Sequence, residues 1–190
     1  MTGNKNFGHN NTLGNDKTLG DWNTIGNNNT LGNDNTLGNR NTLGNRNKLG
    51  DWNTLGDYNT LGNCNALGNW NTLGDWSTLG DYNTLGNDNT LGDYNTLGDC
   101  FQYGDRLTME GVKVIRMMTM ANVDGTGRQI QIIAHTDGVL IRAGCFKGSL
   151  DKFCEKAESE GKIIYKNVVR AAAEALVKSI EELALTGGWD

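Results

Sequence analysis

The 190-residue chain carries 17 Lys and Arg against 22 Asp and Glu, a formal net charge of −5, and it contains 27 glycines and no proline. The absence of proline suits a stack of paired strands, because proline lacks the N–H that a strand ladder requires. The sequence has no run of eighteen apolar residues and no apolar signal core at its N-terminus. These features argue against a membrane or secreted protein, and we expect a soluble, cytoplasmic one with free cysteines.

A six-residue phrase, Thr-Leu-Gly-Asn/Asp-x-Asn, occurs fifteen times without an insertion between Thr12 and Phe101. So short and strict a period is typical of a solenoid. Alternation along an extended segment directs the Leu and the Asn two residues before it inward, and the Thr outward. Gly and the following Asn or Asp tolerate the positive φ of a sharp corner. Each phrase therefore predicts one short strand and one corner, with weaker copies at residues 7–8 and 103–106.

The inward Asn would be costly alone, but identical Asn side chains stacked coil on coil can bond one another and the corner backbone. The phrase resembles the hexapeptide repeat of left-handed β-helices, in which three hexads form one triangular coil, although that family prefers Ser, Thr, Ala or Val where this chain has Asn. Residues about 18 apart should then be alike. At the variable position x this spacing aligns rings and one guanidinium: Trp22, Arg40, Tyr58, Trp76 and Tyr94. We predict a left-handed β-helix-like β-solenoid, about 18 residues per coil, over residues 1–106.

The acidic excess belongs to the repeat. Residues 1–100 hold ten Asp and five Lys or Arg, whereas residues 101–190 hold twelve acids and twelve bases. Residues 49–100 have seven Asp and no base. At about 4.8 Å per coil this is about one negative charge per 2 Å of axis, close to the ~1.7 Å of duplex DNA. Acidic corners also keep a repeat protein soluble and protect its strand edges.

Beyond Gly111 the pattern changes to that of a small α+β domain, which we expect over residues 107–190. Three segments alternate like strands and predict an antiparallel meander: 112–117, 129–133 and 139–142. Two helices follow. Such a domain could cap the solenoid or make an oligomer.

Ser149 can cap the first helix, whose apolar residues recur at helical spacing: Leu150, Phe153, Cys154 and Ala157. The second helix, residues 162–183, carries one apolar stripe that is long enough to cover the sheet: Ile164, Val168, Ala172, Leu176 and Ile180.

The run from Arg142 to Phe153 contains Gly144-Cys145-Phe146-Lys147-Gly148 and is followed by Tyr165 and an Ala-rich helix. It resembles the C-terminal module of phage and prophage pentapeptide-repeat-like proteins. This chain departs from them by having hexads rather than pentads and by lacking a His after the first helix. The resemblance implies a phage-encoded protein in the cytoplasm of an infected or lysogenic bacterial host. Some other pentapeptide-repeat proteins are acidic DNA mimics, which by analogy implies a host protein as partner.

Catalysis finds little support in the sequence. The two histidines, His9 and His135, lie near no Ser or Cys arrangement. Residues 125–127 form a Gly-Thr-Gly that we interpret as a hairpin turn rather than a phosphate loop, because no helix follows. Cys64 and Cys100 would lie two coils apart, beyond disulfide reach. We expect a non-enzymatic protein without cofactor or metal.

The leading hypothesis is that Asp-rich corners with neighbouring rings mimic a nucleic-acid backbone and engage a host defence or DNA-processing protein. Direct binding to nucleic acid or to a membrane is not expected. The alternative is that the rings only stabilise the corners and Asp only solvates them. The candidate partner-binding residues are Asp51, Trp52, Asp57, Tyr58, Asp75, Trp76, Asp81, Tyr82, Asp93, Tyr94 and Asp99.

Two other binding functions stay open. The outward Thr residues form two unbroken rows, at 18, 36, 54, 72 and 90 and at 24, 42, 60, 78 and 96, which resemble an ice-binding surface. Lys48 and Ala66 break the third row. Alternatively, the solenoid is a structural spacer and the C-terminal domain forms a homo-oligomer, a dimer or a trimer.

Overall fold

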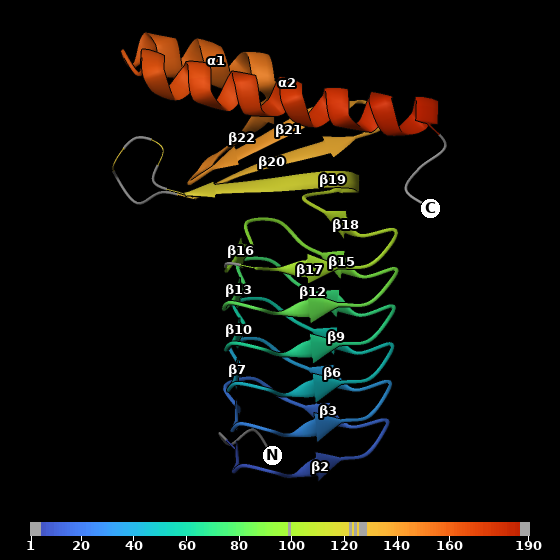
Figure 1. The fold of residues 1–190 in the computed structure, drawn as a ribbon. Coiled ribbons are helices and arrows are strands. Elements are labelled where there is room, and N and C mark those ends of the chain that lie inside the picture. The colour runs from blue at the N-terminus through green and yellow to red at the C-terminus, as the bar shows by residue number, and fades with distance from the viewer. Residues whose placement is uncertain (1–4, 99, 122, 124, 126–128, 187–190) are drawn as a thin grey trace. The chain divides into compact units, whose positions relative to one another are not determined.

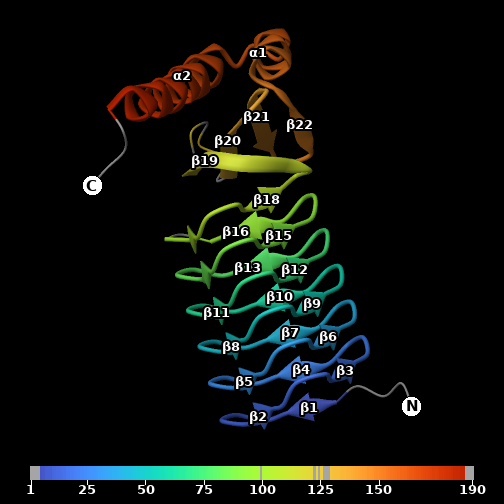
Figure 2. The same ribbon diagram turned by 90° about the vertical axis from the view of Figure 1, so that its right-hand side faces the viewer.

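In the computed structural model, residues 5–98, 100–121, 123, 125 and 129–186 are described, residues 183–186 by their backbone alone (Figures 1 and 2). The chain divides into two compact units, Met1–Val112 and Lys113–Asp190. None of the helices in this described part is both long and apolar enough to cross a lipid bilayer.

The first unit is a β-solenoid whose two-residue strands stack in three parallel sheets of six strands each (Figure 2). The first sheet contains β1 (Asn6–Phe7), β4 (Thr24–Ile25), β7 (Thr42–Leu43), β10 (Thr60–Leu61), β13 (Thr78–Leu79) and β16 (Thr96–Leu97). The second contains β2 (Thr12–Leu13), β5 (Thr30–Leu31), β8 (Lys48–Leu49), β11 (Ala66–Leu67), β14 (Thr84–Leu85) and β17 (Gln102–Tyr103). The third stacks β3 (Thr18–Leu19), β6 (Thr36–Leu37), β9 (Thr54–Leu55), β12 (Thr72–Leu73), β15 (Thr90–Leu91) and β18 (Thr108–Met109).

Strand register confirms the predicted coil of about 18 residues. Thr60 pairs with Thr42 on one side and Thr78 on the other. The weaker copies also belong to the stack, because Phe7 pairs with Ile25 and Tyr103 with Leu85. The coils continue past residue 106, the boundary expected from the sequence, since β18 pairs with β15.

The interior of the solenoid is a column of Leu and a column of Asn. Leu43 and Leu61 are at most 1% exposed. At Asn41 the side-chain Oδ1 accepts the backbone N–H of Asn23 at 2.7 Å, and Nδ2 donates to the carbonyl of Gly38 at 2.7 Å. Each inward Asn thus bonds a neighbouring coil and its own corner, which confirms the predicted ladder and explains how these amides can be buried.

The corners correct one expectation. Positive φ falls on the variable residue x, for example 62° at Trp52 and 57° at Tyr58, and not on the Gly or on the Asn or Asp that follows it. Gly is needed for a different reason. A Cβ on Gly74 would lie 2.7 Å from the carbonyl carbon of Gly56, one coil earlier, and would overlap Oδ1 of Asp57. Gly therefore sets how closely the coils stack.

The second unit is an antiparallel sheet covered on one face by two helices (Figure 1). Its strands follow the order β19 (Val112–Ala121), β20 (Gln129–His135), β21 (Gly138–Ala143) and β22 (Phe146–Ser149). The predicted meander of three strands thus has a fourth. Ala143 pairs with Phe146 around Gly144 (φ 60°) and Cys145, so the Gly-Cys-Phe-x-Gly motif is a tight hairpin that enters β22.

Helix α1 (Leu150–Ser159) begins as predicted, because Ser149 accepts the N–H of Lys152. Phe153, Cys154 and Ala157 are buried in the sheet-facing core.

Helix α2 (Ile163–Thr186) differs from the prediction in the face that it buries. Ile164 is 78% exposed and Val168 38% exposed. Leu176 is buried as expected, with Ala172 and Ile180 packed beside it, but the helix start is anchored by Tyr165, whose ring lies 5.2 Å from that of Phe153. Since each residue turns the helix by about 100°, this anchor directs Ile164 outward.

Candidate partner-binding ridges

The residues at position x form three ridges along the corners of the solenoid. Ridge 1, between the third and first sheets, consists of Trp22, Arg40, Tyr58, Trp76 and Tyr94. Ridge 2, between the second and third sheets, consists of Asp16, Asp34, Trp52, Trp70, Asp88 and Arg106. Ridge 3, between the first and second sheets, consists of Asn10, Asn28, Arg46, Cys64, Tyr82 and Cys100.

The candidate binding residues are divided among these three corners. Six of them lie together at ridge 1: Asp57, Tyr58, Asp75, Trp76, Asp93 and Tyr94. Asp51 and Trp52 belong to ridge 2, and Asp81 and Tyr82 to ridge 3. Asp99 lies outside the described residues. Ridge 1 is therefore the corner where most of the candidates meet.

Ridge 1 is a continuous stack, as the 18-residue spacing predicts. The guanidinium carbon of Arg40 lies 5.1 Å from the ring centroid of Trp22 and 5.3 Å from that of Tyr58. Tyr58 and Trp76 follow at 6.4 Å, and Trp76 and Tyr94 at 4.4 Å, with ring planes within 13° of parallel. Rings and cation stabilise one another by stacking and cation–π attraction, yet Tyr58 is still 50% exposed and Trp76 48% exposed.

Ridge 2 contains a ring that the sequence search missed. Trp70 stacks on Trp52 with centroids 5.1 Å apart and planes 4° from parallel. The search selected rings preceded by Asp, whereas Trp70 follows Asn69; the spacing of 18 from Trp52 was the signal that points to it.

The same ridge ends in an ion pair between Arg106 and Asp88. Hydrogen bonds from the Arg106 guanidinium, helped by its charge, hold the pKa of the Asp88 carboxyl below its usual range. Asp88 is thus already neutralised by a cation of the same chain, and ridge 2 is less acidic than its sequence indicates.

A column of carboxylates runs beside ridge 1. The N–H of Asp75 donates to Oδ1 of Asp57 at 2.9 Å, and the N–H of Asp93 donates to Oδ1 of Asp75 at 2.7 Å. Three acidic residues are therefore stacked on successive coils, about 4.8 Å apart. This corner ladder uses one carboxylate oxygen of each Asp as an acceptor.

Asn serves the same ladder elsewhere without a charge. Oδ1 of Asn45 accepts the N–H of Asn63 at 2.7 Å, and Oδ1 of Asn69 accepts the N–H of Asn87 at 2.7 Å. The fold needs an Oδ1 at this position and not a carboxylate. Three Asp in succession add repulsion between like charges that Asn would avoid.

Both histidines are engaged in backbone contacts. Nδ1 of His9 accepts the N–H of Asn27 at 2.8 Å, in the place that a corner Asn takes in later coils. Nδ1 of His135 accepts the N–H of Asp137 at 3.3 Å. Among the described residues, no three His, Cys, Asp or Glu side chains are grouped so that they could hold a metal ion. Cys64, Cys100, Cys145 and Cys154 are free thiols, as expected.

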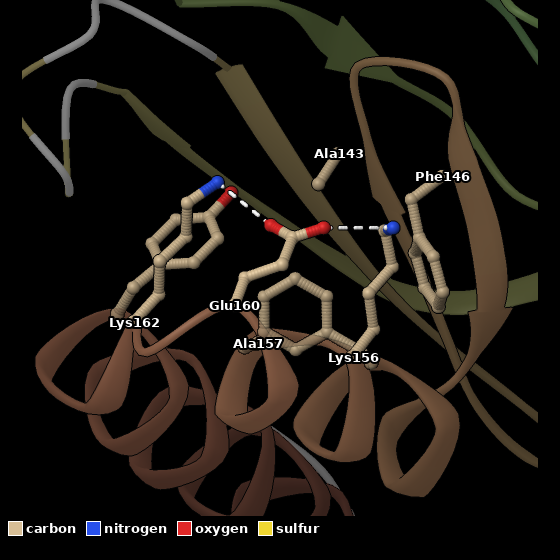
Figure 3. A pocket seen from close by; sticks show the side chains of 8 residues that line it. Ala143, Phe146, Lys156, Ala157, Glu160 and Lys162 are labelled. Carbon is tan, nitrogen blue, oxygen red and sulfur yellow. Dashed lines mark ion pairs between the residues drawn. The ribbon is translucent and has the colours of Figure 1, made fainter.

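The C-terminal unit has a small hollow over the rings of Phe153 and Tyr165 (Figure 3). At its rim, Glu160 forms ion pairs with Lys156 at 2.8 Å and with Lys162 at 2.9 Å. Hydrogen bonds from these two ammonium groups lower the pKa of Glu160 to about 2. The charges at the rim pair with one another, so the hollow has the character of a braced turn between α1 and α2.

No family model, curated protein or solved structure matches the chain. The resemblances found in the repeat and in residues 142–153 therefore remain predictions about relationship, and the ridges must be interpreted from their own chemistry.

Proposed function

We propose that the protein is a non-enzymatic binding protein whose solenoid presents ridge 1 and its carboxylate column to a basic surface of a partner protein. The observation that carries this proposal is the stack of Asp57, Asp75 and Asp93 at positions where Asn supports the fold equally well. Their charge costs repulsion within the solenoid, so it has a use outside it.

The neighbouring rings support the same function. Tyr58 and Trp76 expose about half of their surface, and their stacking in a column holds them rigid before a partner arrives. Rigid aromatic residues next to charges are typical centres of protein interfaces, because little side-chain entropy is lost on binding.

The chemistry of the column also favours a class of partner. A straight row of carboxylates on a rigid rod offers fixed negative charges to Lys and Arg, as a nucleic-acid backbone does. We infer that the partner is a protein that binds nucleic acid, such as a host defence or DNA-processing enzyme in the bacterial setting that residues 142–153 imply.

The test uses a variant and a control with the same change of net charge. Asp57→Asn, Asp75→Asn and Asp93→Asn together remove the column and keep every Oδ1 acceptor. Asp34→Asn, Asp51→Asn and Asp81→Asn remove three charges from the other two ridges. Each chain is immobilised and exposed to bacterial lysate, and captured proteins are eluted with duplex DNA.

We expect the wild-type and control chains to capture the same DNA-eluted proteins and the column variant to lose them by tenfold or more. Equal loss in both variants would mean that binding depends on overall charge, and retention by the column variant would contradict ridge 1. Capture that duplex DNA does not reverse would exclude mimicry of nucleic acid.

The ice-binding alternative stays a prediction. Each Thr-bearing face has one outward Thr for each coil, next to an inward Leu, so it offers a single Thr column. A thermal hysteresis measurement tests it directly.

A further inference from the structure

The outer face of α2 is apolar, although its inner face already packs on the sheet. Ile164 is 78% exposed and Val168 38% exposed, and Ala171 and Ala175 are exposed as well. These four residues follow one another at intervals of four, three and four, which aligns them along one side of the helix. We call them the outer stripe.

The outer stripe is specific to α2. The neighbouring helix α1 also lies on the sheet, and its solvent side is charged: Asp151, Lys152, Glu155, Lys156 and Glu158. Two helices in the same layer thus differ in their solvent faces. An exposed apolar stripe at helical spacing is typical of a helix that packs against another helix.

We propose that the outer stripe pairs α2 with the α2 of a second copy of this chain in an antiparallel, two-fold symmetric dimer. In the register centred between Val169 and Arg170, Ile164 lies opposite Ala175 of the second copy. Val168 then lies opposite Ala171. Every large side chain meets a small one, and the two-fold axis repeats both contacts, as an isologous interface requires.

The distribution of large and small residues selects this orientation. A parallel pair would place Ile164 against Ile164 at one end and Ala175 against Ala175 at the other. The spacing of packed helices depends on the side chains between them, so a parallel pair would splay apart at one end. The antiparallel pair keeps a constant spacing along the contact.

Polar residues at the margin fit the same register. The stripe from Ile164 to Ala175 contains no charged residue, and its nearest polar neighbours on one side are Asn167 and Glu174. In the antiparallel dimer, Asn167 lies beside Glu174 of the second copy, so an amide donor meets a carboxylate acceptor. An ion pair between Lys178 and Glu182, at 3.6 Å, ends the stripe.

The proposed dimer is a weak one. Residues 164–175 span about 17 Å of helix, and a two-helix contact of that length buries less than the ~1,000 Å² of a stable interface. We expect a dissociation constant in the micromolar range. This inference does not rest on the proposed function, but it would benefit it, since a dimer carries two copies of ridge 1 and can bind a multivalent partner more tightly.

Sedimentation equilibrium of the full chain over a concentration series tests the association. Ile164→Glu places a charge in the stripe. Ile163→Glu, the matched control, makes the same change one residue earlier and about 100° around the helix. We expect the wild-type chain and Ile163→Glu to dimerise and Ile164→Glu to remain a monomer with an unchanged circular dichroism spectrum. A monomeric wild-type chain at millimolar concentration, or a dimer that tolerates Ile164→Glu, would overturn the proposal.

Cysteine cross-linking tests the orientation, in a chain whose exposed Cys64, Cys100 and Cys145 are changed to Ser. The double variant Ile164→Cys and Ala175→Cys should form a disulfide-linked dimer under mild oxidation. Ile164→Cys alone should not, because its two copies lie about 16 Å apart in the antiparallel pair. Efficient cross-linking of the single variant would mean a parallel pair and would overturn the register.

Discussion

Glycine has opposite uses in the two units of this protein. In the solenoid, Gly74 has no positive φ, and its missing Cβ leaves room for the backbone of Gly56 one coil earlier. In the C-terminal unit, Gly144 and Gly161 have φ of 60° and 71°, and nothing lies within 4 Å of where a Cβ would stand. The repeat uses glycine for the distance between coils, and the single-copy unit uses it for the direction of a turn.

The two interiors differ in the same sense. The solenoid buries one polar side chain in almost every hexad, and its partner is always the next coil. The C-terminal core is an apolar cluster around Ile132, Ile141 and Val169, packed by shape. Substitutions in the solenoid should therefore be judged by what they do to a neighbouring coil, and those in the C-terminal unit by local packing.

The largest effect that we predict separates the two kinds of glycine. Gly74→Ala forces a methyl group against the backbone of the preceding coil, and we expect it to reduce the free energy of unfolding by about 3 kcal/mol. Gly144→Ala only strains a left-handed turn and should cost about 1 kcal/mol. Urea denaturation followed by circular dichroism measures both. Equal costs would contradict the distinction.

A second substitution tests the polar interior. Asn53→Ala leaves the N–H of Asn35 without its acceptor at 2.9 Å and the carbonyl of Gly50 without its donor. We expect a loss of about 2 kcal/mol, because both groups are buried. Asn53→Ser keeps an acceptor, as Ser77 does for the N–H of Asn59, and should lose about half as much in thermal denaturation. If Ala and Ser cost the same, the ladder contributes little.

The rings on the ridges pose a smaller and more delicate question. Trp52→Asn loses the stack with Trp70, worth about 1 kcal/mol, but it places at φ 62° a residue that tolerates positive φ better. We expect stability to change by less than about 0.5 kcal/mol. A loss well above 1 kcal/mol in chemical denaturation would mean that the rings are kept mainly to stabilise the corner.

The smallest effect concerns the C-terminal unit at low pH. Ion pairs with Lys156 and Lys162 lower the pKa of Glu160 to about 2, below the ~4.3 of an unfolded Glu. Its stabilising contribution is complete above about pH 5 and is lost as the pH falls toward 2. The Glu160 carboxyl should titrate near pH 2 by NMR, and Glu160→Gln should reduce the drop in Tm between pH 5 and 2. A titration midpoint near 4.3 would show that the pairs do not form.

Much of the solenoid was predictable because each residue type recurs in a nearly constant environment. The inward Leu, the stacked Asn and the column from Trp22 to Tyr94 all follow from a period of six and a coil of three hexads. The position of the positive φ did not follow. Trp, Tyr and Arg are poor residues for that conformation by local preference, and they adopt it because neighbouring coils hold the corner through hydrogen bonds, such as that from the N–H of Trp52 to the carbonyl of Asn69.

The C-terminal unit was less predictable because it has no repeat to average over. The cap at Ser149 is a local feature and was confirmed, whereas the inner face of α2 was misplaced at Ile164 and Val168. A helix with apolar residues on two sides does not itself identify which side meets the sheet. The contact of Tyr165 with Phe153 decides that, and it joins residues of different helices.

By itself, the sequence determined the coil length, the inward and outward residues and the acidic excess of the repeat, because these depend on spacing along the chain. Only the tertiary structure decided which acids are stacked at one corner, which is paired with Arg106, why each Gly is required and which face of α2 is exposed. Those properties depend on atoms 18 residues apart or on different elements, and their distances are set by packing.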